Sequence, residues 1–379
     1  MAEAKDALIG FAVANPVRGF LPCPADPALA GTPTEGTALA TCSSDALHIG
    51  RLPWRTLGIA DVRDGDGESL WYAVSGNFTN DAAFINSDAS PPTLSVNGTT
   101  SYAAIIFSPG GAIGVQQRGA TVAACATTGT PLRLDSCATN YLDIDPTSGI
   151  SNADADTTFA QTNGNQFNDL LLPISADQFL GAVGKLVLQQ VRACLVRYAS
   201  NASNPNGLYP WAHQMAGPLG SYDAMSLYSD DPAVTIGRIP DQVFNSVTVP
   251  GVPPAAPLPL SWIGADCPLP CPAVFPGVSC ATSRRNWLKD WHELVFYAVS
   301  PQYAPGGAGG GIPGSFMVNG TSNVRAVVML AGATLSGQTR SSPGARDTFS
   351  NYLESSNASG PTFGITPPPN NDQVLIVAP

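Results

Sequence analysis

Cysteine is the residue type with the clearest capacity for chemistry in this 379-residue chain, which has eight cysteines and only three histidines. Cys23 and Cys42 bracket one loop, and Cys125 and Cys137 enclose a second stretch rich in Thr, Gly and Pro. In the chain-entropy model a bridge that closes a loop of about 13 residues contributes on the order of 3 kcal/mol. We therefore expect a disulfide within each of these two pairs.

The other four cysteines are expected to pair among themselves: Cys194, Cys267, Cys271 and Cys280. Zinc is the competing interpretation for the last three together with His292. Prolines beside Cys267 and Cys271, and a spacing of three residues between these two thiols, fit a zinc knuckle poorly. Disulfides throughout the chain would imply an oxidising, extracytoplasmic compartment.

Two acidic clusters are candidates for binding calcium, the one cofactor that the sequence suggests. Asp64, Asp66 and Glu68 alternate with glycines, and Asp154 and Asp156 form the second candidate. Alternating carboxylates are how a tight calcium loop presents its oxygen ligands. Neither cluster ends in the bidentate glutamate of an EF-hand, so a structural turn is the alternative for both.

The three histidines are scattered along the chain, and no serine lies in a Gly-x-Ser-x-Gly motif. A catalytic triad or a zinc site would need His48, His213 or His292 to converge with partner groups. The glycine-rich segment 306–311 lacks the preceding strand and following helix of a phosphate-binding loop. We expect each histidine to be a surface or capping side chain and the protein not to be an enzyme.

The composition is that of a folded, loop-rich protein. Charged residues make up 12% and hydrophobic residues 44% of the chain, which contains 38 glycines and 35 prolines. The net charge of −11, without clusters of Lys or Arg, argues against binding to nucleic acid or to anionic membrane surfaces. Proteins or neutral molecules are the expected partners.

The chain repeats itself over long distances. Five sequence landmarks recur in the same order, and the offset between the copies drifts from 225 to 203 residues. The pairs are Trp71–Ser75 with Phe296–Ser300, Val96–Thr99 with Val318–Thr321, Tyr102–Phe107 with Val324–Leu330, Asn140–Leu142 with Asn351–Leu353, and Asn168–Pro173 with Asn371–Ile376. So long a period indicates two tandem domains and not a solenoid. We place them at residues 1–174 and 175–379.

Each copy is predicted to begin with a helix and to end in strands. Ser175 and Gln178 form a capping box, after which apolar residues recur at helical spacing as far as Asn201; a shorter helix at the start of the chain stops at Asn15. Strands are predicted at 70–75, 102–108 and 169–174, and at 294–300, 324–330 and 373–378. Short separations favour antiparallel pairing.

One segment interrupts this pattern in the second copy. Residues 250–276 contain nine prolines and can be neither helix nor sheet interior. With Cys267 and Cys271 inside it, the segment is expected to be a disulfide-stapled surface loop.

Several motifs together resemble the type IV pilin and type II secretion pseudopilin superfamily, in particular bacterial minor pilin-like proteins. In the first copy they are Lys5–Asn15, Leu21–Asp26, Gly50–Gly58 and the strand that follows, and in the second the tail from Asn351 to Asn357 and from Asn371 to Leu375. The resemblance covers most of the first copy and the C-terminal third of the second.

Together with the internal repeat, the resemblance implies an α+β fold of two tandem pilin-like modules, each a long N-terminal helix packed on a small antiparallel sheet with long disulfide-stapled loops. The duplication itself departs from the family, since a usual pilin has one globular head. The leader and the apolar membrane half of the family's first helix are not seen, so we expect an upstream segment to be missing. The chain would then be a non-enzymatic subunit of an extracytoplasmic filament, placed at the tip because a doubled head is bulky. Its partners would be other pilin-like subunits, through the N-terminal helix, and the inner membrane. It would be anchored in the periplasm before assembly and lie in the pilus or at the cell surface afterwards.

Two other functions remain open from the sequence. A surface adhesin or glycan-binding module on a pilin scaffold would use Trp262, Trp287 and Trp291 as an aromatic platform for a surface ligand. A secreted hydrolase is the third interpretation. An exposed aromatic row would favour binding, whereas buried tryptophans would favour a structural role.

Peptide mapping of the unreduced protein is expected to recover Cys23 linked to Cys42 and Cys125 linked to Cys137, because each pair closes a loop that gains from a covalent clamp. The remaining four cysteines should be found linked only to one another. Free thiols at either of the two named pairs, or zinc bound in stoichiometric amount, would contradict the prediction.

Overall fold

The computed structural model describes residues 1–14, 19–42, 48–79, 91–118, 138–154, 156–200, 204–215, 230–240, 291, 293–365 and 370–379. The described residues form two compact units, one ending at Phe179 and the other beginning at Leu180. The division falls inside a helix, whose first turn belongs to the first unit. The segments 125–137 and 250–276, which contain expected disulfides, lie outside the described residues.

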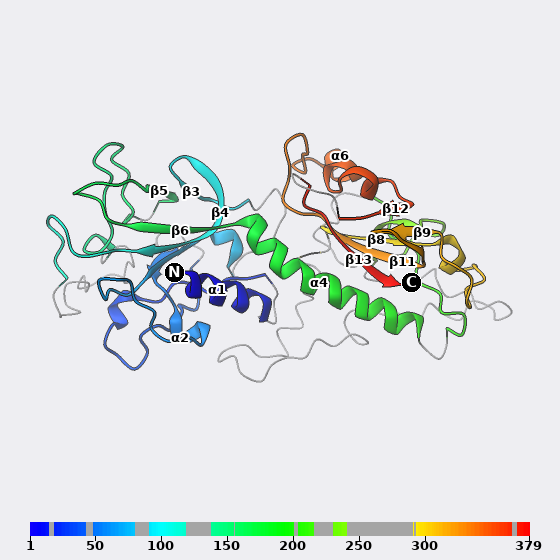
Figure 1. Ribbon diagram of the computed structural model, residues 1–379, viewed down its shortest axis with the longest axis horizontal. Coiled ribbons are helices and arrows are strands. Elements are labelled where there is room, and N and C mark those ends of the chain that lie inside the picture. Colours follow the sequence, from blue (N-terminus) through cyan, green and yellow to red (C-terminus); the bar gives the residue numbers. More distant parts are fainter. Residues whose placement is uncertain are drawn as a thin grey trace. The chain divides into compact units, whose positions relative to one another are not determined.

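The first unit combines a short helix with a six-stranded sheet (Figure 1). Helix α1 spans Ala2–Ala14, and the strands are β1 (Ile49–Arg51), β2 (Trp71–Val74), β3 (Leu94–Val96), β4 (Thr99–Ser108), β5 (Thr158–Phe159) and β6 (Leu170–Ser175). The order is β1-β2-β4-β3-β5, with β6 also paired to β4. All pairs are antiparallel except β3 with β5.

The second unit repeats this order in two sheets. It contains most of helix α4 (Ala176–Ala199), a four-stranded sheet of order β13-β11-β8-β7 and a three-stranded sheet of order β10-β9-β12. The strands are β7 (Ile236–Arg238), β8 (Val295–Val299), β9 (Phe316–Val318), β10 (Thr321–Val324), β11 (Ala326–Leu330), β12 (Thr362–Phe363) and β13 (Gln373–Ala378). The continuous β4 of the first unit is divided here into β10 and β11, beside Asn323, whose φ of 66° lies in the left-handed region.

Short helices complete the two units. The α-helical ones are α2 (Trp54–Leu57) and α6 (Pro343–Arg346), and the 3₁₀ turns are η1 (Pro27–Leu29), η3 (Gly76–Phe78), η7 (Pro301–Tyr303), η8 (Phe349–Asn351) and η9 (Ser355–Ala358). Prolines at the start of η1, η7 and α6 favour these positions, because the first helical N–H groups need no intrahelical partner.

The register of the strands shows the repeat directly. Tyr72 lies opposite Gly50, and Tyr297 lies opposite Gly237. The hydroxyls of the two tyrosines donate to the carbonyls of Pro22 and Pro210, each at 3.1 Å. Because the same strand pairs and the same side-chain hydrogen bond recur, the two units are copies of one arrangement.

Lack of space for a side chain explains the glycine at position 237. A Cβ at Gly237 would lie 2.0 Å from the carbonyl oxygen of His213, which exchanges two backbone hydrogen bonds with Arg238. The equivalent exchange in the first unit joins Ala25 to Arg51.

Both faces of the sheet in the first unit are covered. Trp71, Ile105 and Phe107 point into a core completed by residues of the 138–153 loop, whereas their neighbours Tyr72 and Ile106, on the opposite face, are also fully buried. Strands buried on both faces read as continuous apolar runs and not as alternating ones. The run at 102–107 therefore reflects a sheet that a loop covers on its second face.

The expected fold class, two modules that each pack a long helix on a small sheet, is wrong. Among the described residues there is one long helix, α4, and the 13 strands lie in three sheets, of which one is strongly curled. The reason lies in the connecting segments. Residues assigned to irregular loops form β1, β3, β5, β7, β9, β10 and β12, and the 138–153 loop takes the place of solvent on one face.

The buried side of helix α1 consists of small residues and one leucine. Its fully buried residues are Ala4, Leu8 and Ala12, whereas Phe11 is only half-buried. The first turn is held, since Nζ of Lys5 donates to Oε1 of Gln178 at 2.9 Å. Small alanines at the contact allow a closer approach than Phe11 would.

Helix α4 is amphipathic. Its buried side includes Val183, Val187, Val191 and Leu195. By length and hydropathy alone α4 would be able to cross a membrane, but half of that apolar window is buried in the protein, as in the core helix of many soluble proteins. This is weak support for a membrane span.

Candidate functional site

In each unit, one cluster brings together amide, carboxyl, guanidinium and phenol side chains. The first polar cluster consists of Gln116, Arg118, Asn140, Tyr141, Asp143, Asn152, Asn168 and Asp169, and the second of Gln338, Arg340, Asn351, Tyr352, Glu354, Asn357, Asn371 and Asp372. In each cluster, glutamine and arginine follow a central strand, the Asn-Tyr-Leu motif lies in the loop, and the Asn-Asp pair immediately precedes the last strand.

Two carboxylates of the first cluster clamp two chain segments to each other. Oδ2 of Asp143 accepts hydrogen bonds from the backbone N–H groups of Asn168 at 2.6 Å and Asp169 at 3.1 Å. In return, Oδ2 of Asp169 accepts from the backbone N–H of Asp143 at 2.8 Å. The loop and the start of β6 are thus joined by a reciprocal exchange.

The second cluster makes the same exchange with a longer side chain. Oε2 of Glu354 accepts from the backbone N–H groups of Asn371 and Asp372, both at 3.1 Å. Oδ2 of Asp372 accepts from the backbone N–H of Glu354 at 2.8 Å. Glutamate therefore does here what aspartate does in the first unit.

A buried asparagine extends each clamp to a third segment. Nδ2 of Asn152 donates to Asp169 at 2.9 Å and to the carbonyl of Ala160 at 3.0 Å, while its Oδ1 accepts from the N–H of Ala160. Asn357 makes the equivalent bonds to Asp372 and to both backbone groups of Gly364. Neither asparagine is exposed to solvent at all.

The arginine of each cluster ties further backbone carbonyls together. Arg118 donates through Nε to Asn140 at 3.0 Å and through its terminal nitrogens to Gly110 and to Gln116. Nε2 of Gln116 in turn donates to Asp143 at 2.8 Å.

Arg340 repeats these contacts. It donates through Nε to Asn351 at 2.8 Å, through Nη1 to Gly332 at 3.0 Å and through Nη2 to Gln338 at 3.4 Å. Nε2 of Gln338 donates to Glu354 at 3.1 Å.

The tyrosine of each Asn-Tyr-Leu motif lies between two guanidinium groups. The ring centroid of Tyr141 is 4.0 Å from Cζ of Arg51 and 5.1 Å from that of Arg118. For Tyr352 the distances are 4.7 Å to Arg238 and 4.5 Å to Arg340. Cation–π contacts of this kind contribute about 0.5–2 kcal/mol each, more where the cation is desolvated.

Burial changes the acidity of both clusters. It raises the pKa of Asp169 to about 7, with a further contribution from the charge of Asp143. Burial likewise raises the pKa of Asp372 to about 7, beside Glu354. Oδ1 of each aspartate has no hydrogen-bond partner among the described residues. An ionised oxygen in such surroundings is costly, which favours the neutral carboxyl.

What the clusters can do chemically is limited by access. A carboxyl that ionises near pH 7 is suited to proton transfer. Asp169, however, is 0% exposed and Asp372 is 5% exposed. The Oδ2 atom of each accepts hydrogen bonds from backbone N–H or asparagine amide groups of the chain itself. Each cluster therefore fastens a loop to the start of a strand and is not open to a substrate. We call this arrangement a lock.

In the first calcium candidate, the carboxylate of Asp64 is occupied by backbone N–H groups of the chain. Oδ1 of Asp64 accepts from the backbone N–H groups of Asp66 and Glu68, and its Oδ2 accepts from Gly110 at 2.9 Å. Glu68 lies 3.6 Å from Arg118. Among the described residues no group of three or more His, Cys, Asp or Glu side chains is placed to hold a metal ion.

The second calcium candidate is also occupied by local contacts. Oδ1 of Asp156 accepts from the backbone N–H of Thr158 at 2.7 Å, and its carbonyl lies 2.7 Å from Nε2 of His48. Burial and the charge of Asp156 raise the pKa of Asp154. The structure brings these two carboxylates near each other without a third.

The two described histidines and Trp291, one residue of the alternative aromatic platform, are buried. His48 and His213 are 4% and 8% exposed, so they are not surface side chains; Nδ1 of His213 lies 3.1 Å from Asp231. Trp291 is fully buried. His292, Trp262 and Trp287 lie outside the described residues.

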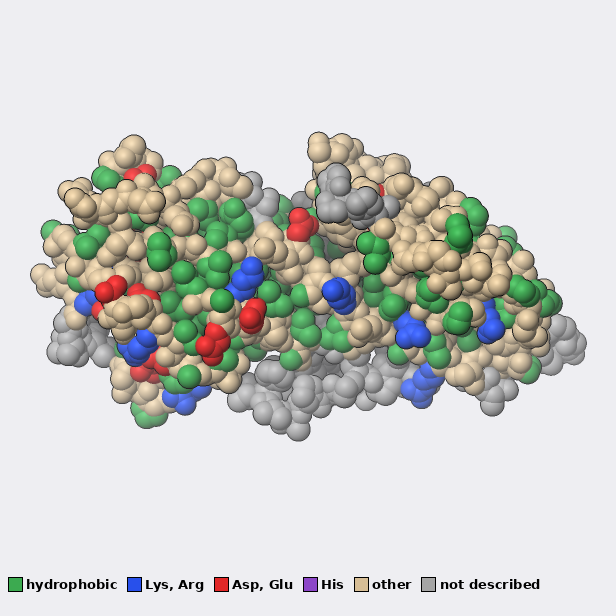
Figure 2. Space-filling model, viewed as in Figure 1, with side chains coloured by type: hydrophobic (Ala, Val, Ile, Leu, Met, Phe, Trp, Pro, Cys, Tyr) green, Lys and Arg blue, Asp and Glu red, His purple; other side chains and the backbone are tan. Residues whose placement is uncertain are grey.

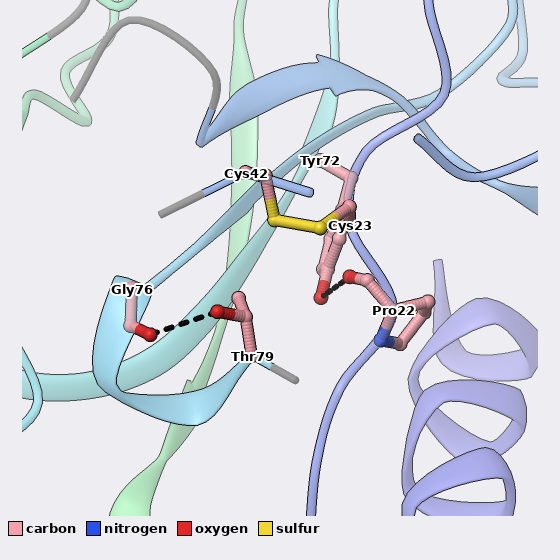
Figure 3. Close-up of a disulfide and its surroundings, with 6 residues drawn as sticks. All are labelled: Pro22, Cys23, Cys42, Tyr72, Gly76 and Thr79. Carbon is pink, nitrogen blue, oxygen red and sulfur yellow. Dashed lines mark hydrogen bonds between the residues drawn. A yellow bond between two sulfur atoms is a disulfide. The ribbon is translucent and has the colours of Figure 1, made fainter. Parts of the chain in front are cut away.

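One disulfide fastens the first unit. Cys23 is bonded to Cys42, with their Cα atoms 5.6 Å apart, next to the hydrogen bond from Tyr72 to Pro22 (Figure 3). Cys194 is also disulfide-bonded. The remaining cysteines, 125, 137, 267, 271 and 280, lie outside the described residues.

Sequence reasoning missed most of the two clusters, although a signal was present. Gln116-Gln117-Arg118 and Gln338-Thr339-Arg340 are a further repeated motif, as are Ile49-Gly50-Arg51 and Ile236-Gly237-Arg238. An alignment of the two copies on the Val-Asn-Gly-Thr motif would have found the first of them, because Val96 and Val318 have the same offset as Gln116 and Gln338.

The raised pKa values of Asp169 and Asp372 predict how stability depends on pH. Because the folded pKa lies above the ordinary value of 3.8, the fold takes up protons, and stability should fall as the pH rises from about 4 to about 7. The slope is at most about 1.4 kcal/mol per pH unit for each carboxyl. Urea denaturation of Asp169→Asn/Asp372→Asn should show a flatter dependence, with Asp66→Asn as the exposed control. An unchanged slope would contradict the raised pKa values.

Removing the buried asparagines should destabilise both units alike. Asn152→Ala and Asn357→Ala each leave a backbone N–H, a carbonyl and a carboxylate without their partner in the interior. The expected loss is about 2–4 kcal/mol of unfolding free energy for each change. Asn77→Ala, which removes one solvent-exposed hydrogen bond to the carbonyl of Pro91, should cost less than about 1 kcal/mol. Equal losses at all three positions in thermal denaturation would show that the clusters are not locks.

Comparisons of this chain with family models, with curated proteins and with solved structures found no match. The functional conclusion must therefore be argued from the residues and their geometry.

Proposed function

We propose that the protein is a non-enzymatic structural subunit of an extracytoplasmic filament of the type IV pilus or type II secretion kind. The observation that carries the proposal is the use of the polar clusters. In both units the buried carboxylates, amides and guanidinium groups are engaged with the chain's own backbone. Groups consumed in this way stabilise a scaffold and do not face a substrate.

The disulfides support the proposed compartment. Cys23 is bonded to Cys42, and Cys194 is disulfide-bonded as well. Such bonds persist in oxidising environments outside the cytoplasm. A subunit displayed in the periplasm or on the cell surface meets that condition.

The first helix supports a role in assembly. Ala4, Leu8 and Ala12 are buried within the first unit, whereas Glu3, Asp6 and Gly10 on the other side of the helix are exposed. The exposed side of α1 is available to a neighbouring subunit. The motifs near this helix, at 5–15 and 21–26, are those that resemble pilin-like proteins.

The adhesin alternative is less well supported. Trp291 is buried and contributes nothing to an aromatic binding platform. We therefore do not extend the proposal to a glycan ligand.

The test is to locate the protein in the cell that produces it. An epitope-tagged copy expressed there should be recovered with sheared surface filaments and should cross-link to pilin-like subunits. A tagged periplasmic protein unrelated to the filament serves as the control for carry-over. Recovery only in the cytoplasm, or in a fraction free of filaments in cells that make them, would contradict the proposal.

A further inference from the structure

The net charge is divided very unevenly between the two units. Residues 1–179 contain 18 carboxylates and seven basic side chains, whereas residues 180–379 contain ten of each. The whole net charge of −11 therefore belongs to the first unit, and the second is neutral. Copies of one fold have acquired different surfaces.

The basic residues of the second unit include a stripe along the exposed side of α4. Its members lie at helical spacing on the side opposite the buried valines: Lys185, Gln189, Arg192, Val196 and Arg197. Val196, near the C-terminal end of the stripe, is 40% exposed and gives it one apolar contact. Figure 2 shows basic side chains over α4 in this view, and we call this surface the basic stripe.

The cations of the basic stripe are not neutralised within the described residues. Lys185, Arg192 and Arg197 form no ion pair there; Nε of Arg192 donates to the carbonyl of Val377 at 3.4 Å, which leaves its charge uncompensated. Three cations on one helix face would bind an anionic protein surface.

The first unit offers such a surface around α1. Glu3 and Asp6 are exposed on α1, and Asp177 is exposed in the first turn of α4. The hydrogen bond from Lys5 to Gln178 brings these segments together. None of the three carboxylates forms an ion pair among the described residues, and we call them the acidic α1 face.

Charge decides between the ways in which two copies can meet. Contact between two first units would bring −11 against −11, and contact between two basic stripes would oppose like charges. Only the acidic α1 face against the basic stripe joins opposite charges. The overall negative charge also disfavours an anionic membrane as the partner of the stripe.

We propose that copies of this chain associate head to tail, with the basic stripe of one copy on the acidic α1 face of the next. Such a contact joins two different surfaces, so each copy keeps one of the two free for a further copy, and the assembly grows instead of closing as a dimer. The inference deepens the proposed filament function by naming a subunit contact, and it rests on that function for its biological meaning.

Sedimentation velocity of the purified chain tests the contact. We expect self-association at about 0.1 M salt that weakens at about 1 M, where the screening length falls from about 10 to about 3 Å. Lys185→Glu/Arg192→Glu/Arg197→Glu should weaken association at least about tenfold, as should Glu3→Lys/Asp6→Lys/Asp177→Lys. Arg55→Glu/Arg63→Glu, which reverses exposed charges elsewhere on the first unit, should leave it nearly unchanged.

Mixing the two reversed variants makes the test independent of folding defects. Neither variant should associate alone, but an equimolar mixture should, because the acidic stripe of one then meets the basic α1 face of the other. A monomeric wild-type chain at all concentrations, a mixture that fails to associate, or binding of the stripe to phosphatidylglycerol vesicles without self-association would each overturn the proposal. These outcomes concern the purified chain, so the cellular test of filament membership would stand separately.

Discussion

The constraint on which each unit depends is the burial of two carboxylates where a long loop meets the sheet. A buried carboxylate is costly unless hydrogen bonds satisfy it. Asp143 and Asp169 reduce this cost because Oδ2 of each accepts from the other's backbone, so neither can keep these partners unless the loop stays on β6. The loop then supplies Ala138, Leu142 and Ala153 to the core that covers the second face of the sheet. A polar exchange thus determines where the apolar contacts form.

Comparison of the two clusters separates what the lock requires from what it tolerates. The second unit has Glu354 in place of Asp143, one methylene longer, yet one oxygen still accepts from two consecutive backbone N–H groups. The other oxygen still accepts from a glutamine that an arginine also holds. The hydrogen-bond pattern recurs although the residue differs, which is expected if the pattern stabilises the unit. Chemistry on a substrate would depend more strongly on where the carboxylate lies.

The sequence was sufficient for features that local pattern or repetition determines. The repeated landmarks, the central strands around 71–75 and 296–300 and the helix from Ala176 all follow from short-range signals. It was not sufficient for the second layer over the sheet, because Ala138 and Leu142 reach the core through a loop without periodicity. The two- and three-residue strands β5 and β12 are likewise too short to carry an alternating pattern. Most members of the polar clusters, such as Asn152 and Asp169, are individually ordinary and become a site only when the fold brings them together.

The two units differ far less inside than outside. The two units share their strand order, their tyrosine bonds to Pro22 and Pro210 and many hydrogen bonds of their polar clusters. In contrast, residues 1–179 carry a net charge of −11 and residues 180–379 a net charge of zero. Core packing and buried polar groups leave little room for change, because each altered group must find new partners. Surface charges are free to diverge at small cost to stability. A duplicated fold can therefore keep one scaffold and present two complementary surfaces, one on each unit.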